Sequence, residues 1–192
     1  EPTLIDELDA RARQRLALAR SLRGSPYPRT GHGGTEVIRL GDIASRYVRP
    51  IRVESSDTYV NLGVRWYGEG LFARSTRSGR DIKATSLYGV KQGALIFNRM
   101  FVTEGSFAIV QKELTNGVVS NEFPAFLLDE SRIVPEWLLL YLLDDRTLKR
   151  VAAEVTGVER GSTKSRRRWK DDQFLEFRIE LPRLEDQIDT LR

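Results

Sequence analysis

Basic side chains are the residues of this sequence whose number and spacing suggest a binding function. They are densest between residues 160 and 170. This segment contains six basic residues and no acidic one: Arg160, Lys164, Arg166, Arg167, Arg168 and Lys170. Lysine and arginine neutralise DNA phosphates and release the counterions condensed on them. The hydroxyls of Ser162 and Thr163 can also donate to phosphate oxygens. A solvated loop or a protein contact would tolerate the same charges, so this segment alone leaves those alternatives open.

A second basic stretch runs from Gly63 to Lys83 and combines cations with aromatic residues and glycines. Its cations are Arg65, Arg74, Arg77, Arg80 and Lys83, opposed only by Glu69 and Asp81. Arginine can reach O6 and N7 of guanine together, and glycine lets a loop approach another surface closely. We predict that these cations and Tyr67 contact DNA, whereas Trp66 is interpreted as a core residue.

Asn98 and Arg99 form a third candidate group, because they lie between apolar residues at the end of an expected strand. Asparagine can pair with adenine, and arginine with guanine or phosphate. For Arg99, an internal salt bridge to an acid such as Glu122 is at least as good an explanation. The predicted DNA-binding residues are therefore Arg65, Tyr67, Arg74, Arg77, Arg80, Lys83, Asn98, Arg99, Arg160, Ser162, Thr163, Lys164, Arg166, Arg167, Arg168 and Lys170.

Catalytic chemistry finds little support in the sequence. Cysteine is absent, and the single histidine, His32, lies in a glycine-rich stretch where we interpret it as incidental. The Asn/Asp-Pro-Pro-aromatic motif of amino-methyltransferases is missing, and the triplet Asp81-Ile82-Lys83 lacks the Pro-Asp that accompanies it in common restriction nucleases. The acid pairs 144–145 and 171–172 could hold a hard cation, but helix capping or balancing of arginines explains them better. We predict no catalytic residue and no metal site.

The composition is typical of a soluble globular protein, with 40% hydrophobic and 30% charged residues among 192. A net charge of +4 permits binding to a polyanion without requiring it. The sequence has no run of 18 apolar residues and no signal-like start. We therefore expect a fragment of a cytoplasmic protein that contacts no membrane.

The hydrophobic pattern predicts a mixed, β-rich α/β fold. Residues 3–23 and 135–155 are expected to be helical, and residues 24–34 to form a linker rich in glycine and proline. Short strands are expected at 36–40, 51–54, 59–64, 94–97, 107–110, 118–120, 125–128 and 175–181. Asn116-Gly117 predicts a hairpin turn. Because strands and helices do not alternate, a doubly wound parallel sheet is not expected.

Apolar residues recur at helical spacing near both ends of the chain. From residue 181 onward the spacing is that of a heptad helix that the end of the chain cuts off. The residues predicted to pack on partner helices are Leu4, Leu8, Leu16, Leu184, Ile188 and Leu191.

Five blocks of the sequence, in this order, resemble one known family. They are NLGVRWYGEG (61–70), LIFNRMF (95–101), VSNEFP (119–124), GSTKSRRR (161–168) and IELPRLEDQ (179–187). The family is that of the DNA-specificity subunits of type I restriction-modification systems. The similarity extends from about residue 36 to the end, and the last block is similar to the family's entry into a long helix.

The resemblance implies a globular target recognition domain at residues 25–180. The end of one spacer helix would lie at 1–24 and the start of another at 181–192. Such a domain would read one half of a bipartite site in double-stranded DNA for a methyltransferase subunit and a restriction or translocase subunit. S-adenosylmethionine, ATP and Mg²⁺ would be bound by those partners, and no cofactor by this chain. A second copy or a second recognition domain would complete the site.

Two other functions stay open at this point. The first is a regulatory module that binds restriction-modification or methyltransferase subunits without reading DNA. The second is a nuclease centred on Asp81 and Lys83. Because base-contacting residues differ among members of the family, the DNA-binding residues named above depend on charge and loop position alone.

Overall fold

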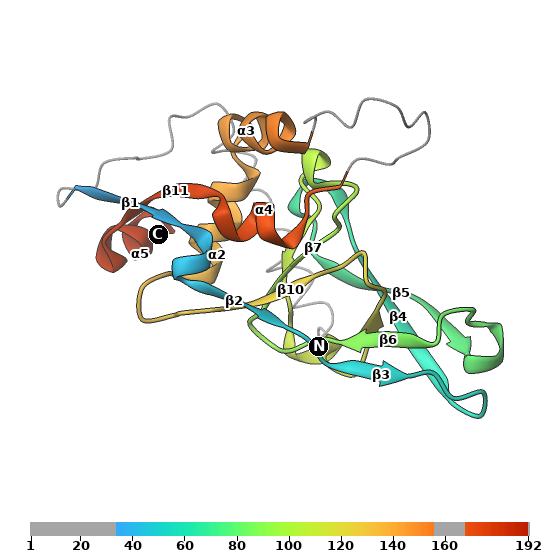
Figure 1. The fold of residues 1–192 in the computed structure, drawn as a ribbon. Helices are drawn as coiled ribbons and strands as arrows, with labels where there is room; N and C mark the ends of the chain where they lie inside the picture. Colours follow the sequence, from blue (N-terminus) through green and yellow to red (C-terminus); the bar gives the residue numbers. More distant parts are fainter. Residues whose placement is uncertain (1–33, 156–167, 192) are drawn as a thin grey trace.

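The computed structural model describes residues 34–155 and 168–191 (Figure 1). The strands are β1 (Thr35–Arg39), β2 (Ala44–Tyr47), β3 (Pro50–Arg52), β4 (Thr58–Val64), β5 (Leu71–Ser78), β6 (Ser86–Gly89), β7 (Leu95–Phe97), β8 (Phe107–Ile109), β9 (Val118–Val119), β10 (Ala125–Leu128) and β11 (Arg178–Pro182). The α-helices are α2 (Pro135–Leu143), α3 (Asp145–Val155), α4 (Asp171–Glu176) and α5 (Leu184–Thr190). Short 3-10 helices include η1 (Leu40–Asp42), η2 (Trp66–Gly68), η3 (Gly79–Asp81), η4 (Val102–Glu104) and η5 (Lys112–Leu114).

The described strands form three sheets. The first pairs β1 with β11, the second has the order β2-β10-β7-β8, and the third has the order β3-β6-β9-β4-β5. Pairing in these sheets is antiparallel except between β4 and β9. The expected mixed, β-rich α/β fold is thus confirmed, and the described part of the chain contains no doubly wound parallel sheet.

The main core lies between the second sheet and the helices, and aromatic rings fill it. The Phe97 ring in β7 lies 5.4 Å from both Trp169 and Phe174 and stacks at 5.9 Å on Phe126 of β10. Helix α2 closes another side and is buried over most of its surface, because it reads Pro-Glu-Trp-Leu-Leu-Leu-Tyr-Leu-Leu. Proline suits the first helical position, where no backbone N–H is needed.

The third sheet extends away from the helices as a projecting arm (Figure 1). We define the arm as residues 50–89. At the end nearer the rest of the molecule, Leu62, Val64 and Leu71 belong to a core shared with the second sheet. In the outer part, Tyr59 and Leu87 form only a small core together with Val118 of β9. The arm therefore buries less apolar surface than the main core does.

Seven of the eight expected strands coincide with observed ones, but other elements differ from the predictions. The expected strand at 175–181 is helical at its start, where α4 buries Phe174, and only Arg178–Pro182 is extended. Acidic residues Asp171 and Asp172 in the first turn favour this helix. Consequently α5 begins at Leu184, after the strand, and not at residue 181.

The helix expected over 135–155 is broken at Asp144. The backbone of Asp144 is extended, with ψ of 136°, and its carboxylate accepts hydrogen bonds from the amides of Arg146 at 2.9 Å and Thr147 at 3.3 Å. This carboxylate caps α3, as expected for the acid pair 144–145.

The hairpin predicted at Asn116-Gly117 is wrong, because the strands on its two sides do not pair with each other. Strand β8 pairs with β7, whereas β9 pairs with β6 and β4. Gly117 is required for another reason: a Cβ there would lie 2.5 Å from a methyl group of Leu62. Strands β2, β5 and β6 were not predicted.

The predicted helix at 3–23 and the linker at 24–34 lie outside the described residues, except for Gly34, and so do Leu4, Leu8 and Leu16. At the other end of the chain, Leu191 packs on the main core, whereas Ile188 is 40% exposed. Leu184 is half-buried. Among the helices that the structure describes, none is long and apolar enough to cross a membrane.

Candidate DNA interface

A row of exposed cations follows strand β5 and the η3 turn. Arg74 and Arg77 belong to β5, Arg80 to η3, and Lys83 follows it; all four are exposed. Residues 73–77 are exposed in succession, because β5 is the edge strand of its sheet. Its eight residues span about 26 Å, close to the length of about seven base pairs of duplex DNA. The row therefore has the charge and the length to lie along a DNA backbone.

A β-bulge places Arg74 differently from its neighbours. Asn61 pairs with Ser75 and Leu62 with Ala73, so Arg74 has no partner residue on β4. Bulges redirect a side chain and end the regular pairing of an edge. Arg77 donates from its guanidinium to the backbone carbonyl of Asp81 at 2.6 Å and so steadies the η3 turn. Arg74, Arg80 and Lys83 form no ion pair with another described residue.

The η2 turn presents aromatic side chains at the other end of β5. Trp66 and Tyr67 are 46% and 47% exposed, and the Trp66 ring lies 5.4 Å from that of Phe101. The interpretation of Trp66 as a core residue is thus wrong. Tyr67 has a φ of +58°, which is uncommon for a residue other than glycine. The exposed Arg65 stacks over the Phe72 ring at 4.8 Å, so its guanidinium is partly engaged.

Asn98 and Arg99 have structural partners. Asn98 is 7% exposed, and its side-chain oxygen accepts the amide of Met100 at 3.0 Å. Arg99 donates from Nε to Asp171 at 2.9 Å and also to the backbone carbonyl of Asn121. Its side chain is 16% exposed and that of Asp171 is 10% exposed. The internal salt bridge is the alternative that the structure shows for Arg99, with Asp171 as the partner instead of Glu122.

Glu122 pairs with Arg168, the first residue of the basic segment that the structure describes. Their bidentate contact has N–O distances of 2.8 and 2.9 Å. These hydrogen bonds and the charge of Glu122 raise the pKa of Arg168 further above its ordinary value. Lys170 is exposed, and its backbone amide donates to Gln173 at the start of α4. The other members of this basic group, Arg160, Ser162, Thr163, Lys164, Arg166 and Arg167, lie outside the described residues.

Three further arginines were missed by the sequence prediction. Arg46 lies in β2, Arg49 follows it, and Arg52 lies in β3; all three are exposed. The available signal was their density, with three arginines and no acid in seven residues. Arg46 forms an ion pair with Asp171, 2.9 Å from Nε to the carboxylate, and Arg52 forms an exposed pair with Glu54.

The carboxylates do not assemble into a metal site in the described part of the chain. No group of three or more histidine, cysteine, aspartate or glutamate residues lies close enough there to hold an ion. Asp171, one of the candidate cation ligands, balances Arg99 and Arg46 as its alternative interpretation expected. Asp81 and Lys83 are both exposed.

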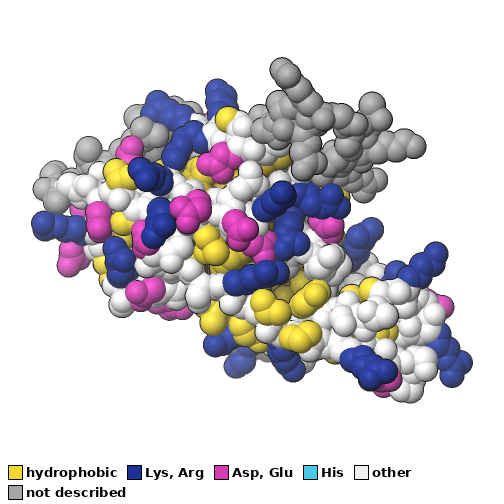
Figure 2. Space-filling model, in the orientation of Figure 1, with side chains coloured by type: hydrophobic (Ala, Val, Ile, Leu, Met, Phe, Trp, Pro, Cys, Tyr) yellow, Lys and Arg dark blue, Asp and Glu magenta, His cyan; other side chains and the backbone are white. Residues whose placement is uncertain are grey.

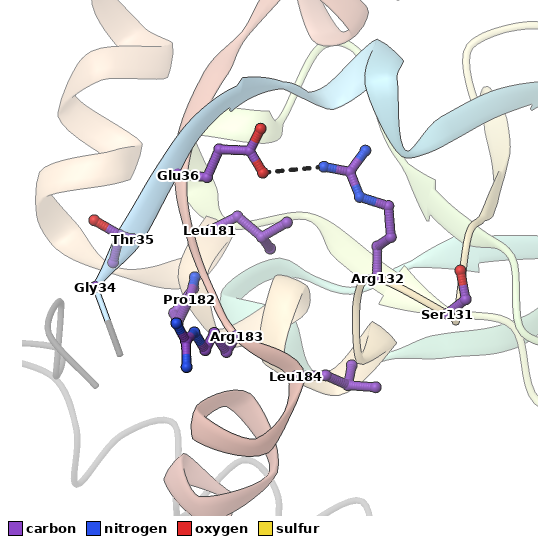
Figure 3. A pocket seen from close by; sticks show the side chains of 9 residues that line it. All are labelled: Gly34, Thr35, Glu36, Ser131, Arg132, Leu181, Pro182, Arg183 and Leu184. Atoms are coloured by element: carbon purple, nitrogen blue, oxygen red, sulfur yellow. Dashed lines mark hydrogen bonds and ion pairs between the residues drawn. The ribbon is translucent and has the colours of Figure 1, made fainter. Parts of the chain in front are cut away.

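A pocket of about 410 Å³ lies elsewhere, where the described chain begins and ends (Figure 3). It is lined by Thr35 and Glu36 of β1, by the turn at Ser131 and Arg132, and by residues 181–184. The ion pair between Glu36 and Arg132, 3.2 Å long, lies across one side of it. This pocket shares no residue with the cation row of β5.

The structure is similar to the crystal structure of an HsdS subunit from Thermoanaerobacter tengcongensis. The TM-score is 0.63 and the identity 18%, over 81% of this chain and 40% of that chain. It is also similar to a chain from a structural study of complex assembly and conformational transition of the type I R-M system. That match has a TM-score of 0.52 and 15% identity, over 96% of this chain and 44% of that chain.

No protein-family model matches the sequence, and no curated protein does. The chain spans less than half of the length of each of these two chains. At these identities the likeness concerns the fold. The chain therefore has the fold found in part of an HsdS subunit, and the fold class implied by the sequence resemblance is confirmed.

Proposed function

We propose that the chain recognises a specific sequence of double-stranded DNA as the specificity component of a type I-like restriction-modification system. The observation that supports this most is the exposed cation row of β5 and η3 on a fold shared with part of an HsdS subunit. Charges along an extended edge suit contacts to phosphates, which position a protein on the duplex, while a few side chains read base edges. Arg74, redirected by the bulge, is the residue we assign to base reading.

Catalysis in this proposal belongs to partner subunits. The chain would direct a methyltransferase subunit and a restriction or translocase subunit to one half of a bipartite site. It would bind no cofactor itself, and S-adenosylmethionine, ATP and Mg²⁺ would be held by those partners. The recognition domain would comprise residues 25–180, and residues 1–24 and 181–192 would join spacer helices. A second copy or recognition domain would supply the other half-site, and the protein would work in the cytoplasm, without membrane contact.

The test is selection from a randomised duplex pool at about 150 mM salt, where non-specific phosphate binding is weak. We expect one motif of a few base pairs to be enriched in the bound fraction. The matched variants are R74A/R77A, which should lose the enrichment, and R183A, which removes an exposed arginine outside the arm. Selection is repeated with the methyltransferase subunit present, since the isolated chain supplies only part of the complex.

Two results would contradict the proposal. If no motif emerges with or without the partner subunit, while the chain still binds that subunit, the protein is a regulatory interaction module. If the chain cleaves duplex DNA with Mg²⁺, and D81N abolishes the cleavage, it is a nuclease.

A further inference from the structure

A small hollow lies between the second and third sheets, and it shares no lining residue with the β5 row. Three aromatic residues line it, namely Tyr47 of β2, Tyr88 of β6 and Phe123, together with Gly89, Arg46 and Asn121. Its volume is about 30 Å³, which is room for about one water molecule. The hollow is thus too small for a metabolite, whose sites measure about 300 Å³ or more.

Two exposed arginines border this hollow. Arg46 lines it directly, with a side chain 51% exposed. Arg49 lies against Gly89: its carbonyl accepts the Gly89 amide at 2.9 Å, and its Cδ would be 3.1 Å from a Cβ at that position. The absence of a side chain at Gly89 therefore makes room for the stem of Arg49.

Two carboxylates form ion pairs with Arg46 and with two further arginines, Arg99 and Arg168. Asp171 contacts both Arg46 and Arg99, and Glu122 contacts Arg168. Arg49 forms no ion pair with another described residue. Two carboxylates thus pair with three arginines, so the acids of this group do not balance all of its positive charge. Figure 2 shows dark blue side chains gathered beside a yellow hydrophobic patch on this face of the molecule.

We propose that Arg46 and Arg49 form a second phosphate-binding site of the DNA interface, with Asp171 as a positioning residue. This inference rests on the proposed function. A phosphodiester suits the site because the nitrogens of Arg46 beyond Nε have no partner among the described residues, and an arginine fork binds phosphate in a fixed geometry. The rings of Tyr47, Tyr88 and Phe123 can contact the adjacent sugar, since they offer apolar surface and carry no charge. Asp171 holds Arg46 before DNA arrives and so reduces the ordering that binding requires.

The experiment measures binding of the full chain to its selected duplex, and to a duplex of unrelated sequence, across a salt series. For R46A and for R49A, the slope of log K against log salt should become smaller in magnitude by about 1. Affinity at fixed salt should fall roughly tenfold, equally for both duplexes, because phosphate contacts carry no sequence information. R183A removes the same charge elsewhere and should keep the wild-type slope. Slopes for R46A and R49A equal to that of R183A would overturn the proposal.

The D171N variant tests whether Asp171 positions Arg46, because the two possibilities change the DNA affinity in opposite directions. Removing an acid makes the chain more positive, so a carboxylate that merely opposes DNA should give tighter binding when it is neutralised. If Asp171 holds Arg46 in place, affinity should instead fall by at least about twofold. Tighter binding by D171N would therefore remove Asp171 from the proposal. If D171N does not fold, as judged by its thermal unfolding, the arginine variants decide alone.

Failure of this inference and failure of the proposed function give different results. A wild-type chain that prefers one sequence, with R46A and R49A unchanged, contradicts only the second phosphate site. If the wild-type chain binds duplexes without sequence preference, but the salt slope of R46A and R49A is smaller in magnitude, the phosphate site stands and sequence recognition is contradicted. A chain that binds no duplex even at low salt contradicts both.

Discussion

Arginines of the arm and arginines beside the main core have different surroundings. On the arm, Arg74 and Arg80 are exposed and form no ion pair with another described residue, and Arg77 bonds only a backbone carbonyl. Beside the main core, Arg99 and Arg168 each contact a carboxylate. Burying a charge costs free energy unless a partner compensates it, so Arg99, whose side chain is 16% exposed, needs its acid and the exposed arginines do not.

This difference indicates which side chains serve the fold and which serve binding. Residues that the fold needs should change the free energy of unfolding when replaced and affect DNA only through folding. Arg74, Arg80 and Lys83 should contribute little to stability, because they are exposed and form no ion pair with another described residue. They should change binding while the unfolding transition stays the same. Each prediction below tests this separation, from the largest effect to the smallest.

The two tryptophans Trp169 and Trp66 give the largest contrast. Trp169 is fully buried, contacts the rings of Phe97, Phe174 and Phe177, and donates from Nε1 to Glu154 at 2.9 Å. W169A should lower the free energy of unfolding by about 3–5 kcal/mol, measured by urea denaturation. W66A is the matched control, with an expected loss under about 1 kcal/mol because Trp66 is nearly half exposed. Equal losses for the two variants would refute the distinction.

Replacement of Arg99 should give the next effect. R99A leaves the carboxylate of Asp171, which is 10% exposed, with Arg46 as its remaining ion-pair partner. We expect a loss of about 2–3 kcal/mol in the same denaturation experiment. R80A is the control from the arm and should change stability by less than about 0.5 kcal/mol. A loss for R99A as small as that for R80A would mean that Arg99 is not part of the structural framework.

The cations of β5 and η3 should affect binding without affecting stability. R80A and K83A should each reduce the magnitude of the salt slope by about 1, with the selected motif unchanged. R74A should also alter the motif at one position, at a cost of about 1–3 kcal/mol for the preferred base. Selection followed by sequencing distinguishes these results. A motif that R74A leaves unchanged would assign Arg74 to phosphate contact.

The sequence predicted those parts of the fold where local pattern and burial agree. Strands such as β4 and β10 have enough apolar residues to be recognised, whereas β5 does not: its segment Ala-Arg-Ser-Thr-Arg is exposed throughout and shows no alternation. The strand expected over 175–181 failed for another reason. Phe174 and Phe177 are both buried, and a helix that ends between them places both rings on Trp169. Phe174 also packs on Phe97 and Phe126, and these contacts with distant strands leave no local signal in the sequence.

The positive charge of the candidate interface could be predicted from the sequence, but the ion pairs of its arginines could not. Exposed cations such as Arg74 and Arg80 were found from the density of basic residues. The same criterion included Arg99, because the sequence does not show that Asp171, 72 residues away, comes within hydrogen-bonding distance. It omitted Arg46 and Arg49, since a group of three arginines is weak evidence until Tyr88 of β6 and Phe123, which precedes β10, are seen beside it.

The smallest effect is expected at an exposed carboxylate, Asp129. The hydroxyl of Ser131 donates to it at 2.6 Å and the Ser131 amide at 3.1 Å. These hydrogen bonds lower the pKa of Asp129 below its ordinary value of 3.8. Because the pKa is lower in the folded state, the stabilisation is fully present above pH 3.8 and is lost as pH falls through the folded pKa. S131A removes the hydroxyl, which makes the larger contribution to the lowered pKa of Asp129. The stability that S131A loses relative to wild type at pH 7 should therefore be smaller below pH 3.8.

Urea denaturation of wild type and S131A at pH 7 and at pH 3 measures that deficit, and an NMR titration of Asp129 measures its pKa directly. S45A, at an exposed serine of β2, is the matched control and should show no pH-dependent difference. DNA binding at pH 7 should be the same for all three proteins, since Asp129 lies in neither the arm nor the arginine-bordered hollow. A deficit that stays constant between pH 7 and pH 3 would show that Ser131 acts through packing and not through the carboxylate. A change in DNA affinity would show that stability and binding are not separable in this molecule.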